Sequence, residues 1–340
     1  MSVVNDVSKI VLRSPGAFAA AVPALVGFYP SDSLVAVFLG EGRVIVTMRL
    51  DLPEDLEEAA EYVAATGTRL GADEVVLVVC CARGAGDLPH HAGVGAVIDA
   101  LEDAGIAVKD AMLIDSGRYW SYLCQSVECC PPEGTLIPED AALEAEKVGL
   151  GQLAVAESRD AVVQQYAPRI DLAPSPETRE QAQSILDVTL AERAKQCWDE
   201  VRMLAATPVP ADPSTDLMRS RLQVAMADVR VRDFVMAKVA LSEDDVDALV
   251  DVVVQAALTA PEDLRPRVAG AASALLAACG TSSIAVSCLL ELADGESLAE
   301  LVRMSQSVPV PPEVLREVFT QALPMVEDQL RASTEVSTTE

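Results

Sequence analysis

The segment from residue 115 to residue 135 holds the densest group of side chains that could carry chemistry. It contains one of the two tryptophans, two of the five tyrosines and three of the eight cysteines of this 340-residue chain. Arg118, Trp120 and Tyr122 alternate, so in a strand they would share one face. A guanidinium beside two aromatic rings can donate hydrogen bonds and stack on a ligand. The spacing predicts a recognition surface; the alternative is that the rings pack under helices and Arg118 pairs with an acid such as Asp115.

Three cysteines, Cys124, Cys129 and Cys130, follow directly. A structural zinc site usually combines two well-separated pairs of cysteines or histidines. The second pair is missing here unless Cys80 and Cys81 contribute from a neighbouring strand. The spacing therefore favours ordinary thiols, with a metal site and a disulfide or redox loop as the alternatives, and we expect no metal and no other cofactor.

Three charged residues complete the set of candidate binding residues. Arg49 and Asp51 alternate near the end of another predicted strand, where a cross-strand ion pair or a ligand contact would explain them. Glu133 lies in a loop that two prolines and a glycine restrict. A ligand-binding role requires all three to gather around one cleft with Arg118 and Trp120.

The usual catalytic constellations are absent from the sequence. The two histidines, His90 and His91, are adjacent, and neighbours in sequence seldom bind the same metal ion. A histidine base with no identified nucleophile is weak evidence for catalysis. No glycine-rich nucleotide-binding loop is present either. An enzyme of unknown class remains an alternative, in which Arg118 holds a small anionic ligand and Asp115, Cys124 or Glu133 supplies proton or thiol chemistry.

The elements that must position these residues form two patterns. The first pattern predicts strands at 33–39, 43–50, 74–81, 106–115 and 118–123, and helices at 55–70 and 93–104. Strands that alternate with helices indicate an α/β domain with a mixed sheet, which we assign to residues 1–150.

Strand-like segments disappear after residue 150. Helical periodicity predicts about seven helices, at 177–206, 214–239, 242–259, 266–278, 282–293, 297–306 and 311–331. We therefore expect an all-α domain of helical hairpins, similar to a repeat protein, over residues 151–331. Residues 332–340 are rich in Ser, Thr and Glu and are predicted to be a disordered tail.

Charge and hydropathy exclude several classes of partner. Fifty-three acidic and 25 basic side chains give a net charge of −28, which opposes direct binding to nucleic acids or anionic membranes. No apolar run reaches the roughly 18 residues that span a bilayer, and the N-terminus lacks the pattern of a secretory signal. We expect a cytoplasmic protein with reduced thiols.

Several motifs resemble those of one family. They lie at residues 12–16, 21–35 and 49–53, and the most distinctive stretch combines residues 118–124 with 129–135. The sequence is similar to the actinobacterial family of the domain of unknown function 4192. The resemblance supports the importance of the 118–134 region and implies no activity or substrate.

These observations favour a cytoplasmic binding or interaction protein with a recognition surface around residues 115–135. Its partner, a protein or a small molecule, is unknown. The rivals are the enzyme described above and an acidic protein that mimics nucleic acid or inhibits a basic partner through electrostatic complementarity.

Overall fold

The computed structural model of the chain describes residues 14–52, 56–124, 126–139, 155–207, 213–280, 283–307, 310 and 312–336. Two compact units divide the chain, Met1–Ala161 and Val162–Glu340. The predicted domain boundary at residue 150 lies outside the described residues. Each unit is described by itself below.

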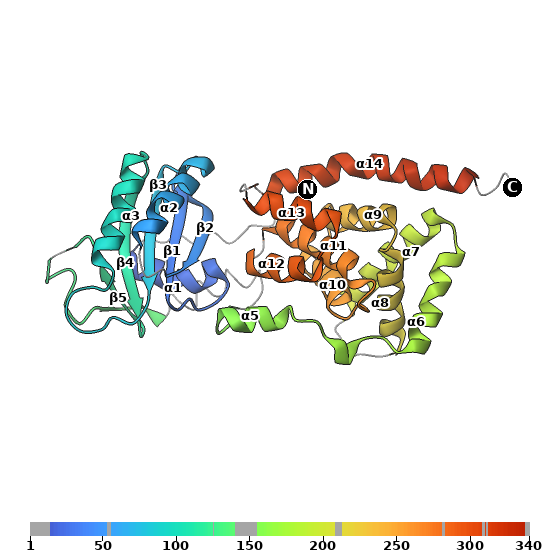
Figure 1. Ribbon diagram of the computed structural model, residues 1–340, viewed down its shortest axis with the longest axis horizontal. Coiled ribbons are helices and arrows are strands. Elements are labelled where there is room, and N and C mark those ends of the chain that lie inside the picture. The colour runs from blue at the N-terminus through green and yellow to red at the C-terminus, as the bar shows by residue number, and fades with distance from the viewer. Residues whose placement is uncertain are drawn as a thin grey trace, which may run out of the picture. The chain divides into compact units, whose positions relative to one another are not determined.

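The first unit is an α/β domain (Figure 1). Its elements are α1 (Pro15–Val26), β1 (Ser33–Gly40), β2 (Arg43–Asp51), α2 (Glu57–Leu70), β3 (Glu74–Cys80), α3 (His91–Asp103), β4 (Ala107–Asp115), β5 (Arg118–Ser121) and β6 (Thr135–Leu136). Among the described residues, the strands form one six-stranded sheet in the order β2-β1-β3-β4-β5-β6. Strands β3 and β4 are parallel and the other neighbours are antiparallel, so the predicted mixed sheet is confirmed.

The predicted hairpin at the start of the sheet is confirmed as β1 and β2. Its turn places Glu41 at φ 52° and Gly42 at φ 71°. Two successive residues with positive φ give the turn a twist that matches the right-handed twist of the paired strands. The parallel pairing of β3 with β4 needs a crossover connection, which α3 provides.

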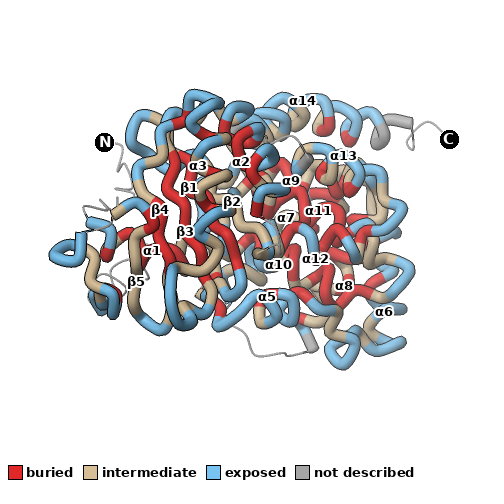
Figure 2. The backbone as a smooth tube through the Cα atoms, turned by 60° about the vertical axis from the view of Figure 1, so that its left-hand side comes forward, coloured by how far each residue is buried: buried red, intermediate tan, exposed pale blue. Residues whose placement is uncertain are grey.

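The sheet is covered on both faces, which explains the nearly continuous apolar sequence of β3. On one face, Phe18 and Val22 of α1 pack with Val35 and Val78. The opposite face packs against α2 and α3 through a separate buried cluster. Figure 2 shows the buried stretches along β1, β3 and β4. We call these two interiors the α1 core and the α2/α3 core.

The second unit is helical, as predicted. Its helices are α5 (Arg159–Gln165, which crosses the unit boundary), α6 (Pro176–Ala182), α7 (Leu190–Ala206), α8 (Pro213–Ala225), α9 (Val229–Ala240), α10 (Val246–Leu258), α11 (Arg265–Cys279), α12 (Ser283–Leu292), α13 (Ser297–Ser307) and α14 (Pro312–Val336). Helix α11 is the most buried of them and packs against α9, α10, α12, α13 and α14.

Two of the predicted helices are divided in the structure. The stretch 177–206 becomes α6, a short 3-10 segment and α7, which begins at a capping box formed by Thr189 and Glu192. The stretch 214–239 becomes α8 and α9, because the Asp228 side chain caps α9 by accepting a hydrogen bond from the Arg230 N–H. Side-chain N-caps therefore begin new helices at points where the apolar periodicity alone would continue one helix.

Helix α14 includes the first residues of the predicted tail, since it extends to Val336. Residues 337–340 lie outside the described residues. Throughout the part of the chain that the structure describes, no helix is both long and apolar enough to cross a membrane.

Candidate functional site

Three loop segments meet where β3 and β4 end, and the first of them is distant in sequence from the other two. They are residues 81–90, 115–124 and 126–135, which we call the loop edge. Side chains tie the segments to one another's backbone. The Asp115 carboxylate accepts a hydrogen bond from the Arg83 N–H at 2.8 Å, and the Tyr122 hydroxyl donates to the Pro89 carbonyl at 2.8 Å.

Arg118 braces the third segment. Its guanidinium donates to the carbonyl oxygens of Gly134 at 2.8 Å and Glu133 at 3.3 Å. The alternative pairing of Arg118 with Asp115 is wrong, although the two residues are opposite one another in the β4–β5 register. Asp115 instead accepts hydrogen bonds from the Arg83 N–H and the Ser116 hydroxyl, which lower the pKa of its carboxyl below the ordinary value.

Trp120 also contacts the third segment, residues 126–135, through its indole ring. The indole N–H donates to the Pro132 carbonyl at 2.9 Å, and the Arg83 guanidinium lies over the ring at 5.8 Å. Gly134 has φ 76° and approaches the ring so closely that a Cβ atom there would overlap it. Trp120 and the 131–134 loop therefore form one packed unit.

The register places Arg118 and Trp120 at alternate positions of β5, on one face, and Tyr122 follows the end of the strand. Trp120 is opposite Leu113, and both contribute to the α2/α3 core with Tyr122. Tyr122 is buried, and this burial raises the pKa of its hydroxyl. The polar atoms of this face bond to the protein's own loops, so the face serves mainly to organise the loop edge.

Arg49 and Asp51 lie elsewhere, so the expectation of one cleft is wrong. They belong to β2, which β1, β3 and β4 separate from β5 in the sheet. Arg49 forms an ion pair with Asp51 in the same strand rather than across strands, and its Nε donates to the Ser33 hydroxyl at 2.9 Å. The Arg49 guanidinium also lies over the Phe28 ring at 5.9 Å, which accounts for the residue without a ligand.

The three cysteines of the loop edge come together. The Sγ atoms of Cys124, Cys129 and Cys130 all lie within 4.8 Å of one another. The Ser121 hydroxyl accepts from the Cys124 N–H at 3.2 Å, and the Ser126 carbonyl accepts from the N–H groups of Cys129 and Cys130 at 3.1 and 2.7 Å. These hydrogen bonds fix the backbone from which the three thiols converge.

The electrostatic environment of the three thiols differs. The backbone N–H of Ser126 and the neighbouring thiols lower the pKa of Cys124 below the ordinary value. Burial and the two other thiols raise the pKa of Cys130. Cys129 is exposed and the other two are half-buried, so solvent reaches the group.

Cys80 and Cys81 do not join this group among the described residues. Cys80 points into the α1 core, where burial raises the pKa of its thiol to about 12. Burial also raises the pKa of Cys81, with smaller contributions from the charges of Asp32 and Asp115. The possibility that these two residues complete a second ligand pair is therefore not supported.

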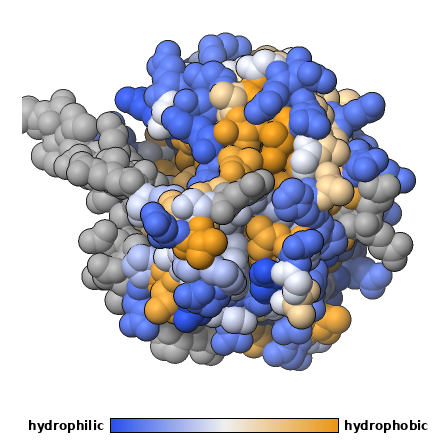
Figure 3. Space-filling view, turned by 90° about the vertical axis from the view of Figure 1, so that its left-hand side faces the viewer, coloured by the Kyte–Doolittle hydropathy of each residue, from blue (hydrophilic) through white to orange (hydrophobic). Residues whose placement is uncertain are grey.

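Exposed apolar side chains lie in the loop edge and next to it, and sequence reasoning missed them. Leu123 and Val127 are 48% and 66% exposed, and Leu136 of β6 is 64% exposed. Hydrophobic side chains gather in patches among hydrophilic ones on the face shown in Figure 3. An apolar residue in a short loop gives no periodic signal, so its exposure follows only from the structure.

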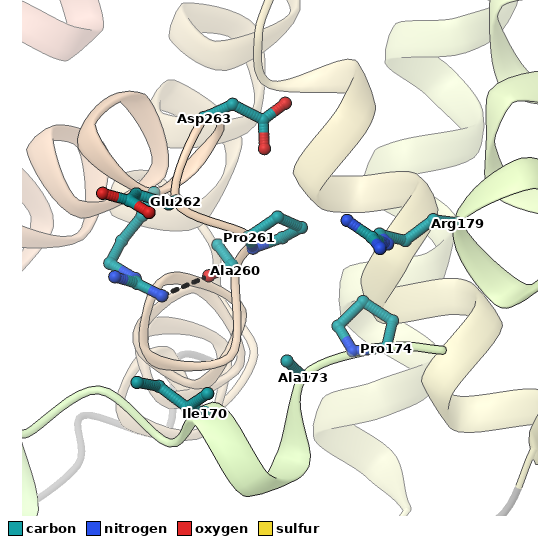
Figure 4. Close-up of a pocket in the computed structure, with 9 residues that line it drawn as sticks. Ile170, Ala173, Pro174, Arg179, Ala260, Pro261, Glu262 and Asp263 are labelled. Atoms are coloured by element: carbon teal, nitrogen blue, oxygen red, sulfur yellow. Dashed lines mark hydrogen bonds between the residues drawn. The ribbon is translucent and has the colours of Figure 1, made fainter. Parts of the chain in front are cut away.

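A second candidate site is a cavity of about 600 Å³ in the helical unit (Figure 4). Its lining includes Ile170, Pro261 and four charged residues, Arg179, Glu262, Asp263 and Arg265. Arg265 donates to the Ala260 carbonyl at 2.9 Å and is thus held by the cavity wall. Two bases and two acids leave the lining balanced in charge, with no preference for an anion.

Comparison with known proteins gives one match. A family model described as a domain of unknown function (DUF4192) matches residues 15–313, which covers most of both units. No curated protein and no solved structure matches the chain.

Proposed function

The chain belongs to the family of the domain of unknown function DUF4192, and from its site we propose that it is a binding protein that recognises a partner through the loop edge. The observation that carries the proposal is the internal bracing of this edge. Arg118 and Trp120 bond to backbone carbonyls of residues 132–134, so the segment is held before any partner arrives. A preorganised surface loses less conformational entropy on binding.

Exposed apolar side chains supply the contact surface of this proposal. Leu123 and Val127 extend from the loop that carries the cysteines. Exposed apolar patches rimmed by polar residues are typical of interaction sites. A protein partner suits such a surface better than a nucleic acid, because the net charge of −28 repels phosphates.

The setting of the protein belongs to the same proposal. We place it in the cytoplasm, where its cysteines would remain reduced, and we infer an actinobacterial origin from the family resemblance. We propose no membrane partner. The identity of the bound protein or small molecule is left to experiment.

The rival functions find less support in the geometry. In an enzyme that holds an anion with Arg118, the anion would have to bond to Nε or Nη2, because Nη1 already bonds to the carbonyls of Glu133 and Gly134. The lowered pKa of Asp115 keeps it ionised, so it is a poor proton donor near neutral pH. An acidic mimic would use the whole surface and would lose its partner as salt is raised.

The first prediction tests the apolar surface with charge substitutions. We expect the double variant Leu123→Asp/Val127→Asp to lose a partner that the wild-type protein captures from native lysate. Docking would bury the two introduced carboxylates, which costs free energy. The matched control is Val44→Asp/Tyr62→Asp, since these residues are also exposed and lie on the same unit. Capture would be measured by mass spectrometry and then by titration with the purified partner.

Each outcome of this experiment has a meaning. Loss of the partner with the loop variant alone, and binding at least about tenfold weaker in titration, would support the proposal. Equal capture by wild type and both variants would contradict it. A small molecule in place of a protein in the wild-type eluate would favour the enzyme.

A further inference from the structure

The cysteine triad, Cys124, Cys129 and Cys130, is the densest group of metal-ligating atoms in the part of the chain that the structure describes. Adjacent cysteines in a strand would point to opposite faces. Here the turn at residues 126–130 directs Cys129 and Cys130 toward the same third sulfur, that of Cys124. Convergence of three sulfurs is more than a single disulfide requires.

The spacing of the triad fits a thiophilic ion. Zinc binds thiolate sulfur at about 2.3 Å with tetrahedral geometry, which sets sulfur atoms roughly 3.8 Å apart. The three sulfurs already lie within 4.8 Å of one another, so an ion would draw them together by no more than about 1 Å. A set of three sulfurs and no oxygens excludes calcium and magnesium, which prefer oxygen ligands.

The surroundings of the triad are those of a supported site. Side-chain and carbonyl acceptors fix the three cysteine N–H groups, and Trp120 holds the Pro132 carbonyl just beyond Cys130. Such second-layer hydrogen bonds orient metal ligands. No carboxylate or imidazole of the described residues joins the group, and Cys129 is exposed, so a fourth position would face solvent.

We propose that Cys124, Cys129 and Cys130 bind one zinc ion through three thiolates and leave its fourth coordination position open. The ion would replace the thiol protons, which are released to solvent on binding. This inference deepens the proposed function, on which it rests for the role of the loop edge, because the ion would hold Cys124 to the turn at residues 126–130 in a single rigid contact surface.

The test measures zinc in the full-length protein, reduced and stripped of metal before the addition of zinc chloride. We expect elemental mass spectrometry to find about one zinc ion per chain. When cobalt chloride replaces zinc chloride, we expect an absorption band from sulfur-to-cobalt charge transfer. The variant Cys124→Ser/Cys129→Ser/Cys130→Ser should bind zinc at least about tenfold more weakly in competition with a chromophoric chelator.

The control is Cys81→Ser, because Cys81 is a partly exposed cysteine of the same unit outside the triad. It should keep its zinc, and circular dichroism would show whether each variant is folded. If the triple substitution unfolds, the single variants Cys124→Ser and Cys129→Ser are compared with Cys81→Ser by their cobalt spectra, and only the first two should weaken the charge-transfer band. Zinc bound equally by the triple variant, absence of the charge-transfer band, or equal loss in Cys81→Ser would overturn the site.

The two proposals can fail separately. The Leu123→Asp/Val127→Asp protein keeps all three cysteines, so it should bind zinc even where it captures no partner. A wild-type protein that captures its partner through the apolar surface but binds no zinc would overturn the metal site alone. Zinc binding without any partner that depends on Leu123 and Val127 would overturn the proposed function alone.

Discussion

Gly134 shows at the residue scale how tightly the loop edge is packed. It combines φ 76° with a close approach to the Trp120 ring, so a methyl group there would be both strained and in collision. We predict that Gly134→Ala lowers the free energy of unfolding by about 1–3 kcal/mol, through the backbone strain and the displaced ring. Urea unfolding followed by circular dichroism would measure the change.

Gly117 provides the matched control for this substitution. It has a similar φ of 73°, but a Cβ atom there would meet nothing within 4 Å. Gly117→Ala should therefore lose only the backbone contribution and be the less destabilised of the two variants. Equal losses would mean that the contact with Trp120 contributes nothing to stability.

The candidate site could be predicted from the sequence only in part, and its residues show why. Alternation placed Arg118, Trp120 and Tyr122 on one face, because the strand period depends on local geometry. Their partners are the backbone carbonyls of Gly134, Pro132 and Pro89. Every residue carries a carbonyl, so sequence offers no signal for which one a distant side chain will meet. For the three cysteines the sequence left a metal site as one alternative, because spacing alone does not show that the turn at residues 126–130 brings the thiols together.

At the scale of the secondary-structure elements, the helix caps determine where the second unit turns. The hydrophobic pattern identified its helical class. In the first unit, Gly71 has φ 66° and ends α2 directly after the predicted helix at 55–70. The pattern missed the breaks before α7 and α9 because apolar periodicity continues through them. Thr189 with Glu192 has the sequence spacing of a capping box, and Asp is a common N-cap residue, so these breaks carry local signals that apolar periodicity alone does not use.

Asp228 also predicts how stability depends on pH. It caps α9 and forms an ion pair with Arg230 at 2.8 Å, and the hydrogen bond from Arg230 is the main cause that lowers the pKa of its carboxyl below 3.8. The ionised Asp228 carboxylate therefore contributes fully to the free energy of unfolding above pH 3.8, the ordinary pKa. This contribution is lost as the pH falls through the lower pKa of the folded state. We predict that Asp228→Asn, which keeps a capping oxygen, loses about 0.5–1 kcal/mol at neutral pH.

Urea unfolding of wild type and Asp228→Asn at neutral and strongly acidic pH would test this prediction. The difference between them should shrink in acid, where the wild-type carboxyl becomes protonated. Arg230→Gln should show a similar loss, and adding it to Asp228→Asn should change little further, because both remove the same pair. A difference that is constant with pH would contradict the assignment.

On the scale of the whole molecule, the net charge of −28 is spread over both halves of the sequence. Like charges on a folded surface repel one another, and salt screens that repulsion. We predict that the melting temperature rises as sodium chloride increases from about 20 mM to about 500 mM. Calorimetry would measure it, with sodium sulfate at equal ionic strength to separate screening from ion-specific effects. A melting temperature that falls with salt would mean that attractive pairs such as Arg232 with Glu296 dominate.

The scarcity of aromatic residues has a practical consequence for spectroscopy. The chain has two tryptophans, and each unit holds one: Trp120 in the loop edge and Trp198 in α7. Each indole is thus a built-in fluorophore for its own unit. In a Trp198→Phe protein the remaining tryptophan emission comes from Trp120 alone, whose indole bonds to the Pro132 carbonyl within the loop edge. Events at the loop edge, from metal loading to partner docking, could then be followed in the intact chain without an added label.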